Sequence, residues 1–121
     1  MSAKRILIAD DNDASRELLK EVLETSGYEV IEAADGVEAL NGARQQAPDL
    51  VLVDIQMPRM DGYEVLRQLR AEPQSAKLQV IALTAFAMQG DRERALEAGF
   101  DGYITKPVEI AALREHIRKL L

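Results

Sequence analysis

Four charged side chains stand directly after short apolar stretches of the sequence, and their types suit metal and phosphate chemistry. They are Asp10, Asp11, Asp54 and Lys106. In an open parallel sheet, the carboxyl ends of the strands line one shared crevice where ligands bind. Three carboxylates that lie close together repel one another unless a cation offsets their charge. If the apolar stretches are neighbouring parallel strands, we expect a divalent-metal site at this edge, with Lys106 as a further fixed positive charge.

The chain alternates between two hydrophobic periodicities, which predicts strands and helices in turn. Short apolar runs rich in β-branched residues occur at 5–9, 29–33, 50–53, 79–83 and 102–105. Longer stretches with helical spacing lie between these runs and after the last one. Five strand–helix units in a row indicate an α/β fold with a mostly parallel sheet, because parallel strands need crossover connections.

Capping residues mark the expected ends of the helices. Asp35 and Asp61 each precede a glutamate by three residues, as in a capping box. Gly27 has the position of a C-cap for the first helix, and Asp13 that of its N-cap. The fourth helix, predicted over 88–98, has the poorest apolar face.

Composition excludes several classes of function. The net charge of −6 argues against binding to a nucleic-acid backbone, which needs clustered cations. The absence of cysteine excludes disulfides and thiolate metal sites. The apolar residues near the N-terminus are too few for a signal peptide or a membrane span. We therefore expect one domain over residues 1–121, in the cytoplasm, without nucleic-acid or membrane partners.

The motif residues together resemble the receiver domain of bacterial response regulators, over essentially the whole chain. They are Asp10-Asp11, Asp54 with Met57-Pro58 and Asp61-Gly62, Thr84-Ala85, and Tyr103 with Lys106-Pro107. Each motif alone is common, but their order at successive strand ends is very specific. The resemblance implies a flavodoxin-like, doubly wound (βα)5 parallel sheet with strand order 2-1-3-4-5.

The resemblance also implies a phosphoacceptor and a metal site. Asp54 would accept a phosphoryl group from a phosphohistidine, giving an acyl phosphate. Asp11 and Asp54 would ligate Mg²⁺ directly, and Asp10 chiefly through water. The backbone carbonyl of Gln56 would complete the protein ligands, a set that suits the octahedral geometry of Mg²⁺.

A conformational switch is implied as well. Lys106 would pair with the phosphoryl group, and its bond to Pro107 is implied to be cis. The Thr84 hydroxyl would move toward the phosphoryl oxygens, and Tyr103 would turn inward into the space left behind. The domain would then catalyse only its own phosphorylation and autodephosphorylation, without acting as a turnover enzyme.

The same resemblance implies the protein partners and bears on the lifetime of the acyl phosphate. A sensor histidine kinase or a histidine phosphotransfer protein would meet the first helix, and a downstream protein would meet the face formed by helix four, strand five and helix five. Phe86, two residues after Thr84, would border the path of the hydrolytic water. We predict that Phe86 substitutions change dephosphorylation more than phosphoryl acceptance.

Other interpretations remain open at this point. Asp11-x-Asp13 resembles the start of haloacid-dehalogenase-type phosphatases, although that function leaves Asp54 unexplained. A pseudo-receiver, which binds proteins without taking phosphate, usually lacks an acid or the lysine, and both are present here. Tyr103 could be a static core residue, and His116 is interpreted as a solvated helix residue.

Overall fold

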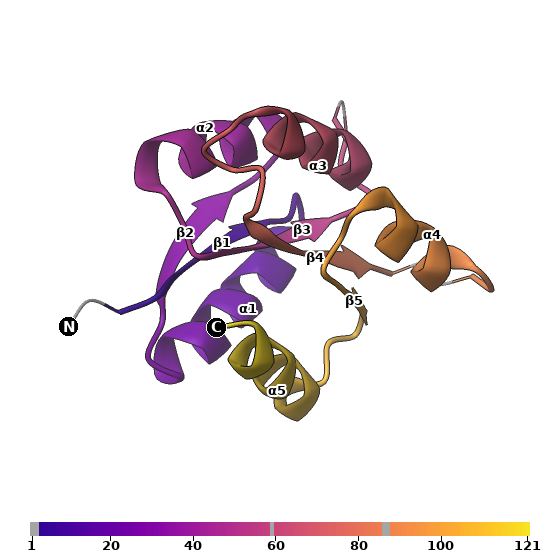
Figure 1. The fold of residues 1–121 in the computed structure, drawn as a ribbon. Helices are drawn as coiled ribbons and strands as arrows, with labels where there is room; N and C mark the ends of the chain where they lie inside the picture. The colour runs from indigo at the N-terminus through magenta and orange to yellow at the C-terminus, as the bar shows by residue number, and fades with distance from the viewer. Residues whose placement is uncertain (1–2, 59, 86–87) are drawn as a thin grey trace.

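Strands and helices alternate along the chain in the computed structural model, which describes residues 3–58, 60–85 and 88–121 (Figure 1). The strands are β1 (Arg5–Ala9), β2 (Glu29–Ala33), β3 (Leu50–Asp54), β4 (Gln79–Thr84) and β5 (Gly102–Thr105). The helices are α1 (Asp13–Thr25), α2 (Gly36–Gln46), α3 (Gly62–Ala71), α4 (Asp91–Ala98) and α5 (Ile110–Leu120). The predicted strand ranges differ from these by at most one residue.

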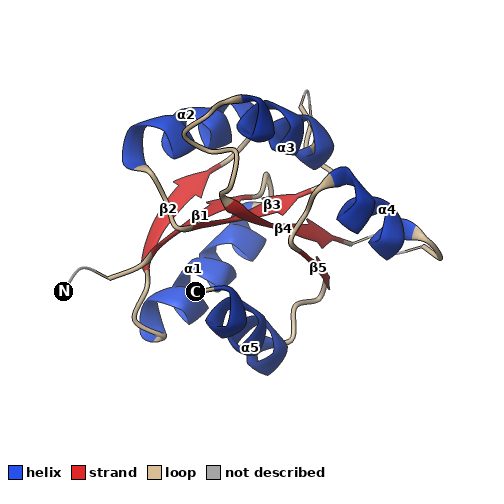
Figure 2. Ribbon diagram, in the orientation of Figure 1, coloured by secondary structure: helices blue, strands red, loops and turns tan. Residues whose placement is uncertain are grey.

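The five strands form one parallel sheet with the order β2-β1-β3-β4-β5. Helices α1 and α5 cover one face of the sheet, and α2, α3 and α4 cover the other (Figure 2). From β1 the chain first adds β2 on one side of the sheet, and it then adds β3, β4 and β5 in turn on the other side. The predicted flavodoxin-like, doubly wound fold is confirmed.

The hydrophobic core consists of two layers, one on each face of the sheet. Leu7 and Val51 pack toward α2 and α3, whereas Ile6 and Leu50 pack toward α1 and α5. Each fully buried leucine or isoleucine contributes about 1.5–3 kcal/mol relative to an exposed one. Every residue of β3 is buried, as expected for a strand without polar alternation. The central strands are therefore rigid supports for whatever follows their carboxyl ends.

The N-cap of α1 corrects one prediction. Asn12, and not Asp13, caps this helix, because its backbone is extended and its side chain accepts a hydrogen bond from the Ser15 N–H at 2.9 Å. Asp13 is instead the first helical residue, and its carboxylate accepts from Arg16. At the other end, Gly27 follows the C-cap with a φ of 95°, a left-handed conformation that favours glycine.

In the two predicted capping boxes, the hydrogen bond accepted by the N-cap side chain is confirmed. Asp35 and Asp61 are the N-caps of α2 and α3, and each side chain accepts a backbone N–H three residues on. The return hydrogen bond differs from the prediction, since the Glu38 carboxylate reaches the Ala34 N–H and not that of Asp35.

Helix α4 is the least firmly held helix. It begins at Asp91, three residues later than predicted, because Gly90 at the N-cap has a φ of 88° and offers no capping side chain. Within α4, which is described throughout, only Ala95 is buried. Phe86, which carries the prediction on dephosphorylation, lies outside the described residues.

None of the helices in the described part of the chain is long and apolar enough to cross a membrane.

Candidate functional site

The sheet topology brings the predicted acids and the lysine to one edge of the molecule. Asp10 directly follows β1, and Asp54 is the last residue of the neighbouring strand β3. Thr84 ends β4, and Lys106 directly follows β5, the strand paired with β4. All four residues therefore stand at carboxyl ends of parallel strands, where ligands bind in this fold class.

Three carboxylates converge at this edge. Asp10, Asp11 and Asp54 each offer one oxygen, and these oxygens lie within 4.8 Å of one another. Asp10 is fully buried and Asp54 is 5% exposed, whereas Asp11 faces solvent. Hard cations such as Mg²⁺ take oxygen ligands at about 2.1 Å, so oxygens at this spacing can reach one ion from several sides. The residues present therefore fit the predicted metal.

Lys106 is the positive charge inside this cluster. Its Nζ donates hydrogen bonds to Asp10 Oδ2 at 2.8 Å and to Asp54 Oδ2 at 2.6 Å. Its backbone N–H donates to the Thr84 carbonyl at 2.8 Å, which ties the end of β5 to the end of β4. The Lys106–Pro107 peptide bond is cis, as predicted.

The pKa values of Asp54 and Lys106 both lie above their ordinary values. Burial is the largest influence on Asp54 and raises its pKa, and the hydrogen bonds from Lys106 and the Gln56 N–H only partly offset it. Burial lowers the pKa of Lys106, but its hydrogen bonds to Asp10 and Asp54 together outweigh that effect and raise it. Three carboxylates face a single ammonium group, so the pocket favours additional positive charge, either a proton or a metal cation.

Two residues that the sequence did not suggest hold the Asp10 side chain. The Asn12 N–H donates to Asp10 Oδ1 at 2.9 Å, and the Ser15 hydroxyl donates to Oδ2 at 2.8 Å. The first contact is an Asx-turn, which an aspartate at a strand end often forms with the residue two positions on. The second has no sequence signature, because it depends on how the first turn of α1 sits over β1.

The loop between β3 and α3 shapes the surroundings of Asp54. The Gln56 N–H donates to Asp54 Oδ1 at 2.8 Å, and the Gln56 side chain accepts from the Thr84 hydroxyl at 3.0 Å. Gly62 permits this loop to close, since a Cβ there would lie 2.8 Å from the Ile55 Cα and 3.0 Å from the Asp54 carbonyl oxygen. The backbone on both sides of Asp54 is therefore fixed.

The Tyr103 hydroxyl is buried and lacks a hydrogen-bond partner within the described ranges. A cavity of about 100 Å³ lies here, lined by Ile55, Gln56, Tyr63, Thr84, Asp91, Arg94 and Tyr103. Burial raises the pKa of Tyr103, and the nearby charge of Asp91 adds to this effect. The cavity connects the Thr84 region with the first turn of α4, and the switching role of Tyr103 stays a prediction.

Two other polar residues lie apart from the cluster. The Asp13 carboxylate is 83% exposed and pairs with Arg16, so Asp11-x-Asp13 does not form the acid pair of the phosphatase alternative. His116 is half-buried against Gly102, and burial lowers its pKa. The interpretation of His116 as a solvated helix residue is therefore confirmed only in part, since the missing side chain of Gly102 lets the ring pack on β5 while the residue stays partly exposed.

The sequence matches the response regulator receiver domain family over residues 6–118. Among curated proteins, it is similar to the polar-differentiation response regulator DivK of Brucella anthropi. The two sequences are 42% identical over 118 residues, which cover 98% of this chain and 96% of that protein.

Solved structures give the same result. The receiver domain of a signal transduction histidine kinase from Syntrophus aciditrophicus is 39% identical, with a TM-score of 0.89 over 98% of this chain and 90% of that one. The receiver domain of sensor histidine kinase PA1611 from Pseudomonas aeruginosa is 36% identical, with a TM-score of 0.90 over 98% of both chains, and has a magnesium ion coordinated in its active-site cleft. Chemotaxis protein CheY4 of Vibrio cholerae is 28% identical, with a TM-score of 0.92 over 99% of this chain and all of that one.

Proposed function

The chain belongs to the response regulator receiver domain family, and from this premise we propose that Asp54 is its phosphoacceptor in a two-component or phosphorelay system. A receiver domain is a signalling module and not a conventional enzyme. The observation that carries the proposal is the position of the Asp54 carboxylate, which is nearly buried and bonded to Lys106 beside two further acids. The similarity to DivK, a response regulator by name, supports the same class of function.

Mg²⁺ is the proposed cofactor. Asp11, Asp54 and the backbone carbonyl of Gln56 would hold the ion directly, and Asp10 would hold it through water. The convergence of three carboxylates supports this ligand set, and so does the magnesium ion in the similar receiver domain from Pseudomonas aeruginosa. Bound there, Mg²⁺ would offset negative charge on the phosphoryl oxygens.

The protein residues then perform the transfer largely by positioning. An Asp54 carboxylate oxygen forms the new bond to phosphorus as the bond between phosphorus and the donor histidine nitrogen breaks. Lys106, now bonded to Asp10 and Asp54, would turn its ammonium donors toward the phosphoryl oxygens. The Thr84 hydroxyl would exchange its contact with Gln56 for a phosphoryl oxygen, and Tyr103 would respond through the adjoining cavity. Autodephosphorylation would be the only other reaction that the domain catalyses.

Two surfaces suit the proposed protein partners. A groove of about 480 Å³ beside Lys106 lies between α1 and the segment after β5, and Leu18 lines it with 52% of its surface exposed. We propose that this groove receives the histidine-bearing donor, a kinase or a phosphotransfer protein. A second groove of about 280 Å³ adjoins β5 and α5, next to Tyr103 and His116, and lies on the proposed face for a downstream protein.

We further propose that residues 1–121 form one receiver domain and that it works in the cytoplasm. The match to the receiver family over residues 6–118 supports the domain assignment. The cytoplasmic location rests on the family's histidine-phosphate donors and agrees with a sequence that has no cysteine.

The test is the intact mass of the protein after incubation with acetyl phosphate and Mg²⁺. We expect the gain of one phosphoryl group, which is lost in Asp54→Asn and in the presence of EDTA. Asp49→Asn is the matched control, because Asp49 bonds the Arg5 N–H at the opposite end of the sheet and should leave the gain intact. A protein that binds Mg²⁺ but gains no phosphoryl group, from acetyl phosphate or from a histidine kinase, would instead be a binding-only module.

A further inference from the structure

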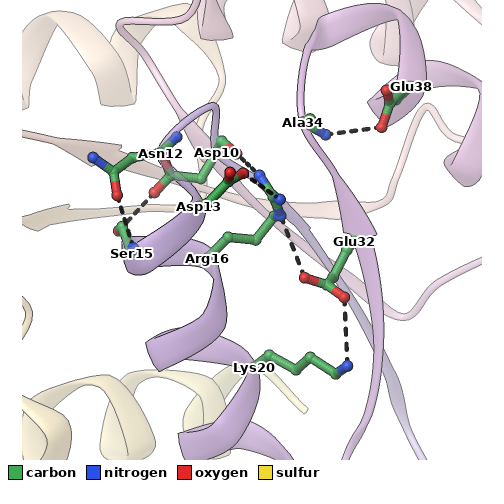
Figure 3. A network of polar contacts seen from close by, with 9 residues as sticks. All are labelled: Asp10, Asn12, Asp13, Ser15, Arg16, Lys20, Glu32, Ala34 and Glu38. Atoms are coloured by element: carbon green, nitrogen blue, oxygen red, sulfur yellow. Dashed lines mark hydrogen bonds and ion pairs between the residues drawn. The ribbon is translucent and has the colours of Figure 1, made fainter.

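A network of polar contacts links Asp10 and the start of α1 to β2 (Figure 3). Arg16 is its centre. We propose that Arg16 is a positioning residue that sets the direction of the Asp11 carboxylate for metal binding. This inference rests on the proposed function, because it concerns the same Mg²⁺ site.

Arg16 contacts three separate parts of the chain. Its Nη1 donates to the Asp10 backbone carbonyl at 2.7 Å, and its Nη2 donates to Asp13 Oδ1 at 2.7 Å. Its Nε donates to Glu32 Oε1 at 3.3 Å, so the guanidinium also reaches across to β2. The side chain is only 15% exposed, although it belongs to the first turns of a surface helix. A planar guanidinium with several fixed donors can serve three acceptors at once, which a lysine ammonium on a flexible stem cannot reproduce.

The contact with the Asp10 carbonyl determines the backbone of Asp11. The carbonyl of Asp10 and the N–H of Asp11 belong to one planar peptide unit, so fixing the oxygen fixes the orientation of the whole unit. The Asp10 N–H is held as well, by the Ala33 carbonyl at 3.1 Å. Arg16 thus completes the restraint on the short segment that connects β1 to the metal-binding loop.

Asp11 depends on this restraint more than the other acids do. Asp10 and Asp54 accept hydrogen bonds from Lys106 and from nearby N–H groups, which orient their carboxylates. The Asp11 carboxylate is exposed and makes no hydrogen bond to any residue in the described ranges. The position of its Cα and Cβ is therefore set by its own backbone, and that backbone is restrained through the Asp10 carbonyl.

The charges around Arg16 also keep Asp11 available. Asp13 and Glu32 both pair with the guanidinium, and Lys20 binds the second oxygen of Glu32 at 3.4 Å. These partners hold Arg16 behind the loop, so that it supports Asp11 without forming an ion pair with it. A cation that binds at the cluster then meets an Asp11 carboxylate that is unpaired and whose backbone is restrained.

The test is the Mg²⁺ dissociation constant of the folded, unphosphorylated protein, measured by NMR titration. Removing partners that orient metal ligands typically weakens metal binding by about 10- to 100-fold. We expect Arg16→Lys and Arg16→Gln to raise the dissociation constant by about tenfold, the low end of that range, because Arg16 acts through the backbone and not on the ligand itself. Arg118→Gln makes the same change in charge at an exposed site on α5, where Arg118 pairs with Glu115, and it should change the constant less than twofold.

Amide hydrogen exchange in the metal-free protein distinguishes a local effect on the segment after β1 from a general loss of stability. In the metal-free Arg16 variants, the amide hydrogens of Asp10 and Asn12, which donate to the Ala33 carbonyl and to Asp10 Oδ1, should exchange faster, while those of the β3 core remain protected. Should Arg16→Gln fail to fold, Arg16→Lys and Glu32→Gln carry the test, since each retains most of the side-chain volume. Folded Arg16 variants that bind Mg²⁺ as tightly as the wild type would overturn the inference while leaving the proposed function intact. A wild-type protein that does not bind Mg²⁺ would overturn both.

Discussion

The Asp54 carboxylate is oriented by a different contact at each oxygen. Oδ1 accepts from the Gln56 N–H, a backbone group whose position is fixed by the loop. Oδ2 accepts from Lys106, a side chain with three donors that can turn toward a new acceptor. A rigid contact thus holds the proposed nucleophile in place, while a movable one remains for an incoming phosphoryl group. The Gln56 contact therefore positions the Asp54 carboxylate, whereas the Lys106 contact neutralises its charge.

Gly62 gives the sharpest prediction at the level of single residues. In Gly62→Ala, the new Cβ would lie 2.8 Å from the Ile55 Cα, and two backbone segments cannot give way as a side chain can. We expect a loss of about 1–3 kcal/mol in the free energy of unfolding, together with weaker Mg²⁺ binding because the Asp54 loop must shift. Urea unfolding and a Mg²⁺ titration measure the two effects.

Gly42→Ala is the matched control for this substitution. Its Cβ would also meet an atom at 2.8 Å, but that atom is the terminal Cδ1 of the Leu7 side chain. A leucine side chain can adjust, and alanine favours the helix interior by about 1 kcal/mol over glycine. Equal losses in both variants would show that backbone contact at Asp54 is not the cause.

At the level of elements, the described contacts of α4 with the rest of the fold are stronger at its C-terminal end than at its N-terminal end. Its N-cap is Gly90, which offers no side-chain hydrogen bond, and its first turn borders the cavity beside Tyr103. Its C-terminal end is held by Arg70, which donates to the Gly99 carbonyl at 3.1 Å and to Asp101 Oδ2 at 3.0 Å. Motion that starts at the proposed phosphorylation site would therefore meet the N-terminal end of this helix first, the end without a side-chain cap.

Arg70→Met tests the anchored end. The variant removes the hydrogen bonds to Gly99, to Asp101 and to the Leu78 carbonyl at 2.6 Å, while it retains an apolar stem. Hydrogen bonds to charged groups contribute about 1.5–3 kcal/mol, so we expect a loss of about 2 kcal/mol, measured by chemical unfolding. Arg67→Met, on the same helix, removes an exposed ion pair with Glu64 and should leave the unfolding free energy nearly unchanged. A similar loss in both variants would contradict an anchoring role for Arg70.

The elements were predictable from the sequence to the extent that local rules determine them. The apolar run 50–53 identified β3 because a strand buried on both faces lacks polar alternation. The start of α4 was placed too early, since spacing alone does not reveal that Gly90 adopts a left-handed conformation. The cap of α1 was misassigned because Asn12 and Asp13 are both capping residues, and the turn that selects Asn12 depends on its contact with Asp10. The roles of Ser15 and Arg16 depend on how α1 packs against β1 and β2, which single-sequence patterns do not specify.

At the level of the whole molecule, the parallel sheet makes a destabilising cluster possible. Strands that run in one direction collect Asp10, Asp54 and Lys106 at one edge, and the two core layers hold the strands in place against the mutual repulsion of the acids. The clustering of acids that suits metal binding therefore lowers the stability of the fold at this edge, a conflict that is common at functional sites. The conflict should be visible in the dependence of folding stability on pH.

Asp54 contributes a decrease in folding stability with rising pH in the metal-free protein. Burial raises its pKa above the ordinary value of 3.8, so the folded protein holds this proton more tightly than the unfolded chain does. The resulting stabilisation is complete below the unfolded pKa and is lost as the pH rises through the folded pKa. Asp54→Asn removes this loss, and we expect it to be more stable than the metal-free wild type at pH 7 by about 1 kcal/mol, read as the unfolding free energy.

Mg²⁺ should act in the opposite direction, because it binds the ionised carboxylates that the metal-free fold tolerates poorly. A ligand at about 100 times its dissociation constant stabilises the folded state by about 2.7 kcal/mol. We therefore expect Mg²⁺ to raise the Tm of the wild type at pH 7 and to have little effect near pH 4, where protons compete for Asp54. Thermal unfolding with Mg²⁺ or EDTA, across this pH range and in both proteins, measures the effect. A Tm increase of the same size in Asp54→Asn would mean that the ion binds elsewhere, whereas loss of the increase would place the metal at the acid cluster that contains Asp54, the proposed phosphoacceptor.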